Sequence, residues 1–191
     1  MSKYDAAMMK TALIWAQESY CKRNKVGAII SRDGRVVSNG YNGTITGADN
    51  CCEENVSNYL KCTRCGCSDK DELTYEEVNE DYHFNEDYHF TNNFCGACKY
   101  TGFVKPVYVT KSKNTIVHAE ANAILFAAKN GIATESCSLY VTLSPCIECA
   151  KMAVQCGIKE VIFLKEYRDS KGIQFLKENG VTIKHLDMDE V

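Results

Sequence analysis

The stretch "SLYVTLSPCIECAKMAVQCGIKEVIFL", residues 138–164, contains the pattern that decides the fold. Residues 138–143 predict a strand, residues 145–156 a helix that ends at Gly157, and residues 160–164 a second strand. A strand, a helix and a second strand in this order form a parallel pair, because the helix returns the chain to the edge where the first strand began. The stretch therefore predicts an α/β layered fold whose second half is parallel.

The same periodicities extend this pattern in both directions. They predict helices over residues 5–21, 119–129 and 170–179, the last of which is stopped by Gly180. They also predict strands over residues 26–30, 35–39 and 181–186. The successive turns of the first helix are marked by Ala7, Leu13 (or Ile14) and Gln17. The helix over residues 119–129 is apolar nearly all round, which predicts that it is buried.

Composition and charge limit the classes of function. The 191-residue chain has a net charge of −3 and 45% hydrophobic residues, which is typical of a soluble globular protein with one core. The small negative charge gives no general nucleic-acid-binding surface, so a nucleic-acid partner is not expected. Neither a signal peptide nor a membrane-spanning apolar run is visible, which predicts a cytoplasmic protein, in the host cytoplasm if it is viral. In a reducing compartment, the twelve cysteines are more often metal ligands than disulfides.

The middle of the chain has a different composition. From about residue 51 to residue 113 the sequence is polar, acidic and rich in cysteine, which predicts an insertion within a single domain of residues 1–191. Residues 79–84 are repeated as residues 85–90, a period too short for a repeat fold. A duplicated surface loop is the plain interpretation. The alternative is a metal role for the two histidines of the repeat, His83 and His89.

Two helix starts carry the candidate site. Ser144 suits the N-cap, and Pro145 the first position, of the helix that follows the first strand of the opening stretch. Cys146 and Cys149 then share one face of its first turn, where exposed N–H groups favour the thiolate form that a metal requires. His118 stands at the start of another helix.

These side chains match the ligand set of a catalytic metal. His118, Cys146 and Cys149 would give zinc three protein ligands and leave the fourth position open, as in catalytic rather than structural sites. Glu120, two residues after His118, would then be a general acid and base and not a ligand. The alternatives are a redox dithiol and a closed structural zinc site with a fourth Cys or His.

Several motifs together resemble those of the zinc-dependent cytidine deaminases. The H-x-E and P-C-x-x-C signatures of that family are matched by residues 118–120 and 145–149. The chain is also similar to the deoxycytidylate (dCMP) deaminases, particularly those of viruses, in "KVGAII" (25–30), "GYNG" (40–43), "HAEANAILFAAKNG" (118–131) and "YVTLSPCIECAK" (140–151). The resemblance implies a cytidine-deaminase fold, a central mixed five-stranded sheet sandwiched by helices, assembled as a homo-hexamer. It also implies hydrolytic deamination of dCMP to dUMP and ammonia, which supplies dTTP synthesis.

The resemblance also implies roles for residues around the site. Family members place the asparagine of "GYNG", here Asn42, against the nucleotide. From their position after a strand, Tyr167 and Arg168 are the candidates for binding the phosphate, and Ser144 is a further candidate for binding the substrate. A tight Asn-Gly turn is the alternative for Asn42, and a solvated charged loop for residues 165–172. Regulated members are activated by dCTP and inhibited by dTTP, with Mg²⁺, at positions that correspond to Lys25, Asn50 and Asn122. Asn122 lies one turn after His118, so it could instead help to order the catalytic site.

Further cysteines suggest structural zinc. The viral enzymes often hold a second zinc, and two of its ligands correspond to Cys21 and Cys51. Its other ligands would fall near Tyr108 and Ile116, which cannot bind zinc, so either the insertion supplies them or the site is lost. Two C-x-x-C pairs within the insertion predict one structural zinc, held by Cys62, Cys65 (or Cys67), Cys95 and Cys98. The two cysteines expected to pack as small hydrophobic residues are Cys137 and Cys156.

Two other functions compete with dCMP deamination. The first is deamination of another cytosine substrate: a nucleoside, dCTP or a nucleic acid. The second is a zinc-ribbon binding protein with an inactive deaminase body. The intact set of His118, Glu120, Cys146 and Cys149 argues against an inactive body, because such a body has no reason to retain a buried glutamate.

Overall fold

The chain forms two compact units in the computed structural model, which describes residues 3–62, 90–91, 94–95, 100–101 and 104–190. The first unit consists of Met1–Glu53 together with Ser112–Val191, and the second of Glu54–Lys111. The chain thus leaves the first unit after Glu53 and returns to it at Ser112.

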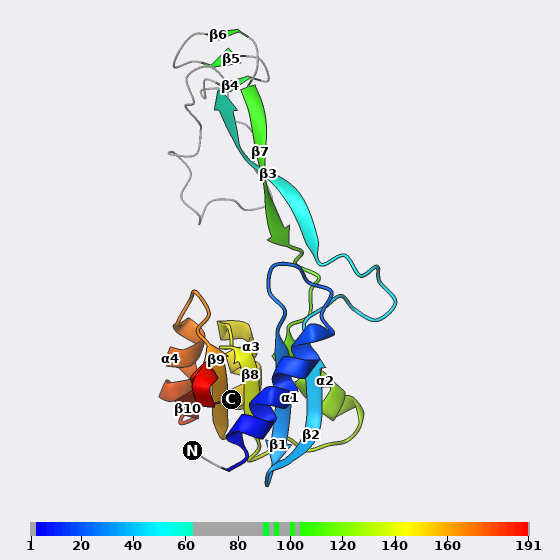
Figure 1. The fold of residues 1–191 in the computed structure, drawn as a ribbon, viewed down its shortest axis with the longest axis vertical. Coiled ribbons are helices and arrows are strands. Elements are labelled where there is room, and N and C mark those ends of the chain that lie inside the picture. Colours follow the sequence, from blue (N-terminus) through cyan, green and yellow to red (C-terminus); the bar gives the residue numbers. More distant parts are fainter. Residues whose placement is uncertain (1–2, 63–89, 92–93, 96–99, 102–103, 191) are drawn as a thin grey trace. The chain divides into compact units, whose positions relative to one another are not determined.

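The first unit is built on a five-stranded sheet with the order β10-β9-β8-β1-β2 (Figure 1). Its strands are β1 (Gly27–Arg32), β2 (Arg35–Tyr41), β8 (Ser138–Leu143), β9 (Glu160–Lys165) and β10 (Thr182–His185). Strands β8, β9 and β10 run parallel, whereas β1 is antiparallel to both of its neighbours. The sheet is therefore mixed, and its parallel half is the one predicted from residues 138–164.

Helices cover both faces of this sheet. They are α1 (Asp5–Gln17), α2 (Ala119–Lys129), α3 (Ile147–Gln155) and α4 (Lys171–Glu178), followed by the short 3₁₀ helix η2 (Met188–Glu190). Successive side chains of a strand point to opposite faces. Accordingly, Leu139 and Val141 of β8 join the core that packs against α2, α3 and α4, while Tyr140 joins the core beneath α1. The α/β sandwich implied by the resemblance is confirmed.

The end and the buried face of α1 show where periodicity was insufficient. The helix ends at Gln17 and not at residue 21, and its apolar buried residues are Met8, Met9, Ala12 and Ala16. The residues that mark its predicted turns are not on this face, because Ala7, Ile14 and Gln17 are exposed and Leu13 is only partly buried. Alanine and methionine occur on several sides of this helix, so the pattern did not single out one face.

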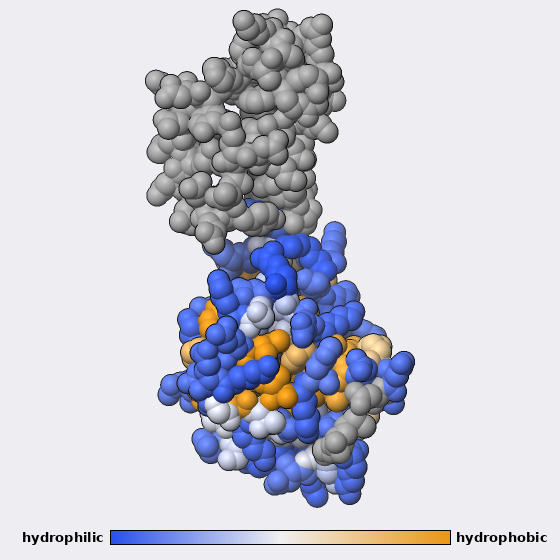
Figure 2. Space-filling model, turned by 90° about the vertical axis from the view of Figure 1, so that its left-hand side faces the viewer, coloured by the Kyte–Doolittle hydropathy of each residue, from blue (hydrophilic) through white to orange (hydrophobic). Residues whose placement is uncertain are grey.

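Helix α2 has the predicted bounds but not the predicted burial. Leu125 is 56% exposed and Phe126 is 50% exposed, so one side of α2 faces outward. Figure 2 shows the opposite side of the first unit, that of α4 and β10 in Figure 1, on which hydrophilic side chains also surround smaller hydrophobic areas. An apolar composition all round a helix therefore did not mean burial on every side.

Glycines end α3 and α4 as predicted. Gly157 and Gly180 follow these helices with φ angles of 77° and 76°, in the left-handed region that favours glycine. The N–H of Gly157 donates to Val154 O, and that of Ile158 to Ala153 O, which closes the end of α3.

The second unit contains only strands among its described residues. They are β3 (Glu53–Cys62), β4 (Phe90–Thr91), β5 (Phe94–Cys95), β6 (Tyr100–Thr101) and β7 (Val104–Ser112). Strands β3 and β7 form a two-stranded sheet, and β4, β5 and β6 a three-stranded antiparallel sheet. In the described part of the chain, no helix has the length and hydrophobicity that crossing a bilayer requires.

Candidate active site

His118 lies at the N-cap of α2, held by the strand beside it. An antiparallel bridge joins Val117 to Gly43, just after β2, with N–O distances of 2.9 and 3.1 Å. The N–H of Asn122 donates to His118 O at 2.9 Å, which is the first hydrogen bond of the helix. The side-chain amide of Asn122 donates to Tyr41 O at 2.7 Å. The end of β2 and the residues just after it therefore fix the position of His118 at the start of α2.

Cys146 and Cys149 lie at the start of α3, but the helix begins later than predicted. Its N-cap is Cys146 and its first residue Ile147, not Ser144 and Pro145. The Ser144 hydroxyl accepts a hydrogen bond from the N–H of Tyr167 at 2.8 Å. Because that oxygen is bonded to a distant loop, it does not cap the helix, and Cys146 O accepts the first helical hydrogen bond, from Ala150 N at 2.9 Å.

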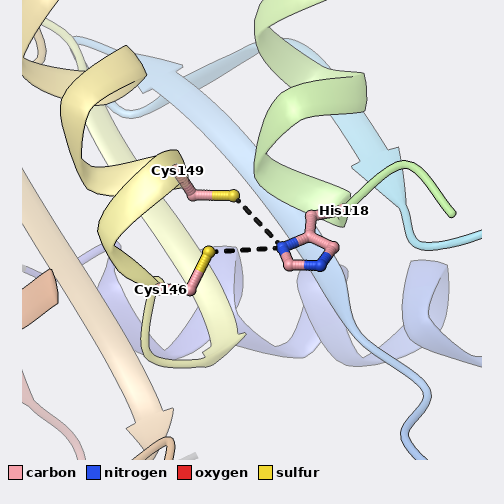
Figure 3. Close-up of side chains that lie close together, drawn as sticks. All are labelled: His118, Cys146 and Cys149. Carbon is pink, nitrogen blue, oxygen red and sulfur yellow. Dashed lines mark hydrogen bonds between the residues drawn. The ribbon is translucent and has the colours of Figure 1, made fainter. Parts of the chain in front are cut away.

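The three side chains converge on one point (Figure 3). Nδ1 of His118 lies 3.5 Å from the Sγ of Cys146 and 3.4 Å from the Sγ of Cys149, and all three atoms lie within 4.8 Å of one another. A tetrahedral zinc with ordinary bond lengths holds a nitrogen and a sulfur about 3.6 Å apart. The spacing therefore fits a zinc ion with one imidazole and two thiolate ligands.

The site is open on one side. His118 is exposed, Cys146 half-buried and Cys149 buried. Among the described residues, no fourth Cys, His, Asp or Glu joins this group. Three ligands and an open side are the arrangement of a catalytic zinc and not of a closed structural one.

The electrostatics of the cluster favour a cation. The hydrogen bond from the Cys149 thiol lowers the pKa of Cys146 to about 3, and the His118 ring adds to this effect. The same hydrogen bond, together with burial, raises the pKa of Cys149. Its hydrogen bond to Cys146 also raises the pKa of His118. A metal ion bound to both sulfur atoms would displace the thiol proton of Cys149.

Glu120 is buried in the first turn of α2, beside these ligands. Its side chain is 4% exposed, and burial raises its pKa to about 7, while a hydrogen bond from its own backbone N–H acts in the opposite direction. It also interacts with the Cys149 thiol through a hydrogen bond. The carboxyl group is therefore placed next to the metal ligands and away from bulk water.

Comparison with known proteins establishes the family. The profile described as "Cytidine and deoxycytidylate deaminase zinc-binding region" matches residues 2–165. The chain belongs to this family. It is 34% identical over 181 residues to the deoxycytidylate deaminase of Enterobacteria phage T4, covering 87% of this chain and 80% of that protein. It is 32% identical over 164 residues to the human deoxycytidylate deaminase, covering 85% of this chain and 65% of that protein.

A solved structure agrees with these sequence relatives. The dCMP deaminase of cyanophage S-TIM5, solved in complex with dCMP and dUMP, matches with a TM-score of 0.66 and 28% identity, covering 97% of this chain and 98% of that chain. The resemblance to viral members of the family and the expected fold are thereby confirmed. The chain is a deaminase, and the zinc-binding region of its family includes all three converging side chains.

The predicted substrate residues occupy two places. Asn42 is buried, and its side-chain oxygen accepts from Val26 N at 2.8 Å while its amide donates to Asn24 O at 2.8 Å. These bonds connect the loop after β2 to the segment before β1. Ser144 and Tyr167 are joined by a hydrogen bond beside Cys146. The Arg168 guanidinium lies 5.7 Å from the centre of the Tyr167 ring.

The predicted effector residues each have a local partner. The Lys25 ammonium donates to Gln17 O at 3.1 Å, at the last residue of α1. The side-chain oxygen of Asn50 accepts from the Thr44 hydroxyl at 3.5 Å. With the hydrogen bond from Asn122 to Tyr41 O, the three contacts lie in three different connections around the sheet.

The predicted structural-zinc residues are only partly described. Cys21 is buried and interacts through a hydrogen bond with Cys52, whose pKa burial raises to about 12. Cys51 is exposed, and its sulfur donates to Glu53 O at 3.3 Å. Cys52 was not identified from the sequence as a neighbour of Cys21. Its only signal in the sequence is that it directly follows Cys51. Ile116 is partly buried, and its side chain has no atom that could bind zinc.

The remaining cysteines divide between the core and the insertion. Cys137 is buried in the core and Cys156 packs against it, as predicted. In the second unit, Cys62 ends β3 and Cys95 ends β5. Outside the described residues lie Cys65, Cys67, Cys98, His83 and His89.

Proposed function

We propose that this chain catalyses the hydrolytic deamination of dCMP to dUMP and ammonia. The observation that carries the proposal is a buried carboxyl group, that of Glu120, beside an imidazole and two thiols spaced for zinc. The likeness to the cyanophage protein that was solved with dCMP and dUMP supports this choice of substrate.

The residues divide the chemistry between them. Zinc, when bound by His118, Cys146 and Cys149, supplies a Lewis acid that makes a water molecule nucleophilic near neutral pH. Glu120 takes a proton from that water and gives it to N3 of the cytosine ring as the oxygen adds to C4. Glu120 then carries the second proton of the water to the amino group. The C4–N bond breaks, ammonia leaves, and C4 keeps the oxygen as a carbonyl.

Substrate recognition is assigned to the two places described above. Tyr167 and Arg168 belong to the segment that is hydrogen-bonded to Ser144, next to Cys146. The positive charge of the exposed Arg168 side chain suits the 5′-phosphate of dCMP. Asn42 would bind the nucleotide less directly, because its amide is already engaged with the backbone on both sides.

Regulation, assembly and location are further parts of the proposal. The chain would be activated by dCTP and inhibited by dTTP, each with Mg²⁺, would form a homo-hexamer and would act in the cytoplasm. The insertion, about residues 51–113 within one deaminase domain, would carry a structural zinc on Cys62, Cys65, Cys95 and Cys98. A second structural zinc would be bound by Cys21 and Cys51.

The test is the ultraviolet absorbance of dCMP incubated with zinc-loaded protein, followed with and without dCTP or dTTP. Loss of the cytosine absorbance, faster with dCTP and slower with dTTP, supports both reaction and regulation. A rate unaffected by either nucleotide removes the regulatory part. Deoxycytidine, dCTP and single-stranded DNA are tested in parallel. If one of them is converted faster than dCMP, that compound and not dCMP is the substrate. If zinc is bound and none is converted, the proposal is wrong and a binding function takes its place.

A further inference from the structure

Gly172, the second residue of α4, lies directly against the backbone that carries Cys146. The residue is buried, and a Cβ atom placed on it would lie 2.0 Å from Pro145 O and 3.0 Å or less from Cys146 O and C. Because real Cβ atoms come no closer than about 3.0 Å to such atoms, any other residue at this position would push α4 and the Pro145–Cys146 peptide apart by about 1 Å.

Ser144, the residue before Pro145, is bound by the end of β9 and by the segment that connects β9 to α4. The N–H of Ser144 donates to Lys165 O at 2.8 Å, and the Ser144 hydroxyl accepts from Tyr167 N at 2.8 Å. Ser144 is 2% exposed, so these bonds are shielded from water. The segment over residues 165–172 thus contacts both the residue before Pro145 and the peptide after it.

We propose that Gly172 is a positioning residue for the metal centre. It allows α4 to lie against the Pro145–Cys146 peptide, and this contact fixes the Sγ of Cys146 at its distance from Nδ1 of His118. Metal–ligand distances are held to within about 0.2 Å, so a displacement of about 1 Å at Cys146 is too large for an unchanged site. The inference rests on the proposed zinc-dependent function.

Gly27 offers a matched control on the other face of the sheet. It is buried in β1, and a Cβ atom on it would lie 2.0 Å from Ala12 O and 2.6 Å from Ala16 N, both in α1. The steric conflict is of the same kind and severity as at Gly172. Helix α1, however, contributes none of the three ligands. A Gly27→Ala substitution therefore reproduces the overpacking without touching the peptide at Cys146.

The experiment compares zinc affinity in Gly172→Ala, Gly27→Ala and the unsubstituted protein. Each metal-free protein is titrated with zinc against a chromophoric chelator, and then with cobalt(II) to record the thiolate charge-transfer absorption. We expect Gly172→Ala to raise the zinc dissociation constant by about tenfold or more and to change the cobalt spectrum. Loss of the contacts that hold a metal ligand in place has an effect of this size on metal affinity. We expect Gly27→Ala to lower the melting temperature but to leave the dissociation constant unchanged. Equal dissociation constants in all three proteins, or equal weakening in both variants, would overturn the inference.

A milder variant covers the case in which Gly172→Ala does not fold. Ser144→Ala removes the hydroxyl that accepts from Tyr167 and adds no atom. We expect it to weaken zinc binding several-fold, and an unchanged dissociation constant would count against positioning by this segment. An unsubstituted protein that fails to bind zinc would instead refute the proposed function itself, so the two failures are distinguishable.

Discussion

Replacing Glu120 by glutamine removes the proposed proton carrier while keeping the shape of the site. The side chain is 4% exposed and interacts with the Cys149 thiol. Glutamine has the same number of heavy atoms, so no cavity forms and the three metal ligands keep their places. The amide, however, can neither take a proton from water nor return it to the substrate.

The size of the effect follows from the burial of this group. A positioned general acid and base contributes about 10²- to 10⁴-fold in rate, which is about 3–5 kcal/mol in the activation free energy. We expect a loss near the upper end, because burial keeps bulk water from acting as a substitute base. The free energy of unfolding should not fall, since the variant no longer buries a carboxyl group that can be charged.

The assay measures kcat for dCMP and the zinc content of the same preparation. Glu148→Gln is the control, because this glutamate lies between the two cysteine ligands in sequence, is 71% exposed and pairs with Lys151 at 2.7 Å. An exposed ion pair contributes little, so the control should keep its kcat within about twofold. A zinc-loaded Glu120→Gln protein with kcat within about tenfold of the unsubstituted protein would refute the role of Glu120.

Two further perturbations test the metal and the core. Removal of zinc by a chelator should lower the melting temperature measured by calorimetry. Zinc at a hundred times its dissociation constant should restore about 2.7 kcal/mol to the free energy of unfolding. A melting temperature that does not respond to zinc would contradict binding at His118, Cys146 and Cys149. Tyr140→Phe should lower the free energy of unfolding by about 1.5–3 kcal/mol in a denaturant titration, because the Tyr140 hydroxyl donates to the wholly buried Asp5 at 2.9 Å. Its kcat should not change, and a large fall in kcat with unaltered stability would show that this hydrogen bond serves the site and not the core.

Local pattern accounts for the parts of the fold that were predicted correctly. The bounds of α2 and β8 follow from hydrophobic periodicity, and the ends of α3 and α4 from glycines at positions that require positive φ. The parts that were wrong depend on partners far away in the sequence. The start of α3 moved because the Ser144 hydroxyl is bonded to Tyr167, and Leu125 and Phe126 are exposed because only one side of α2 meets the sheet.

The sequence by itself determined the chemistry of the site, because that chemistry depends on residue types at short spacing. His118 with Glu120, and Cys146 with Cys149, are each set within one turn of a helix start. Only the tertiary structure decided that the two pairs meet. His118 follows a bridge to the end of β2, whereas Cys146 follows β8, and β1 lies between these two strands. Strand order and the contact of Gly172 with Cys146 arise from packing between distant segments, which no local pattern encodes.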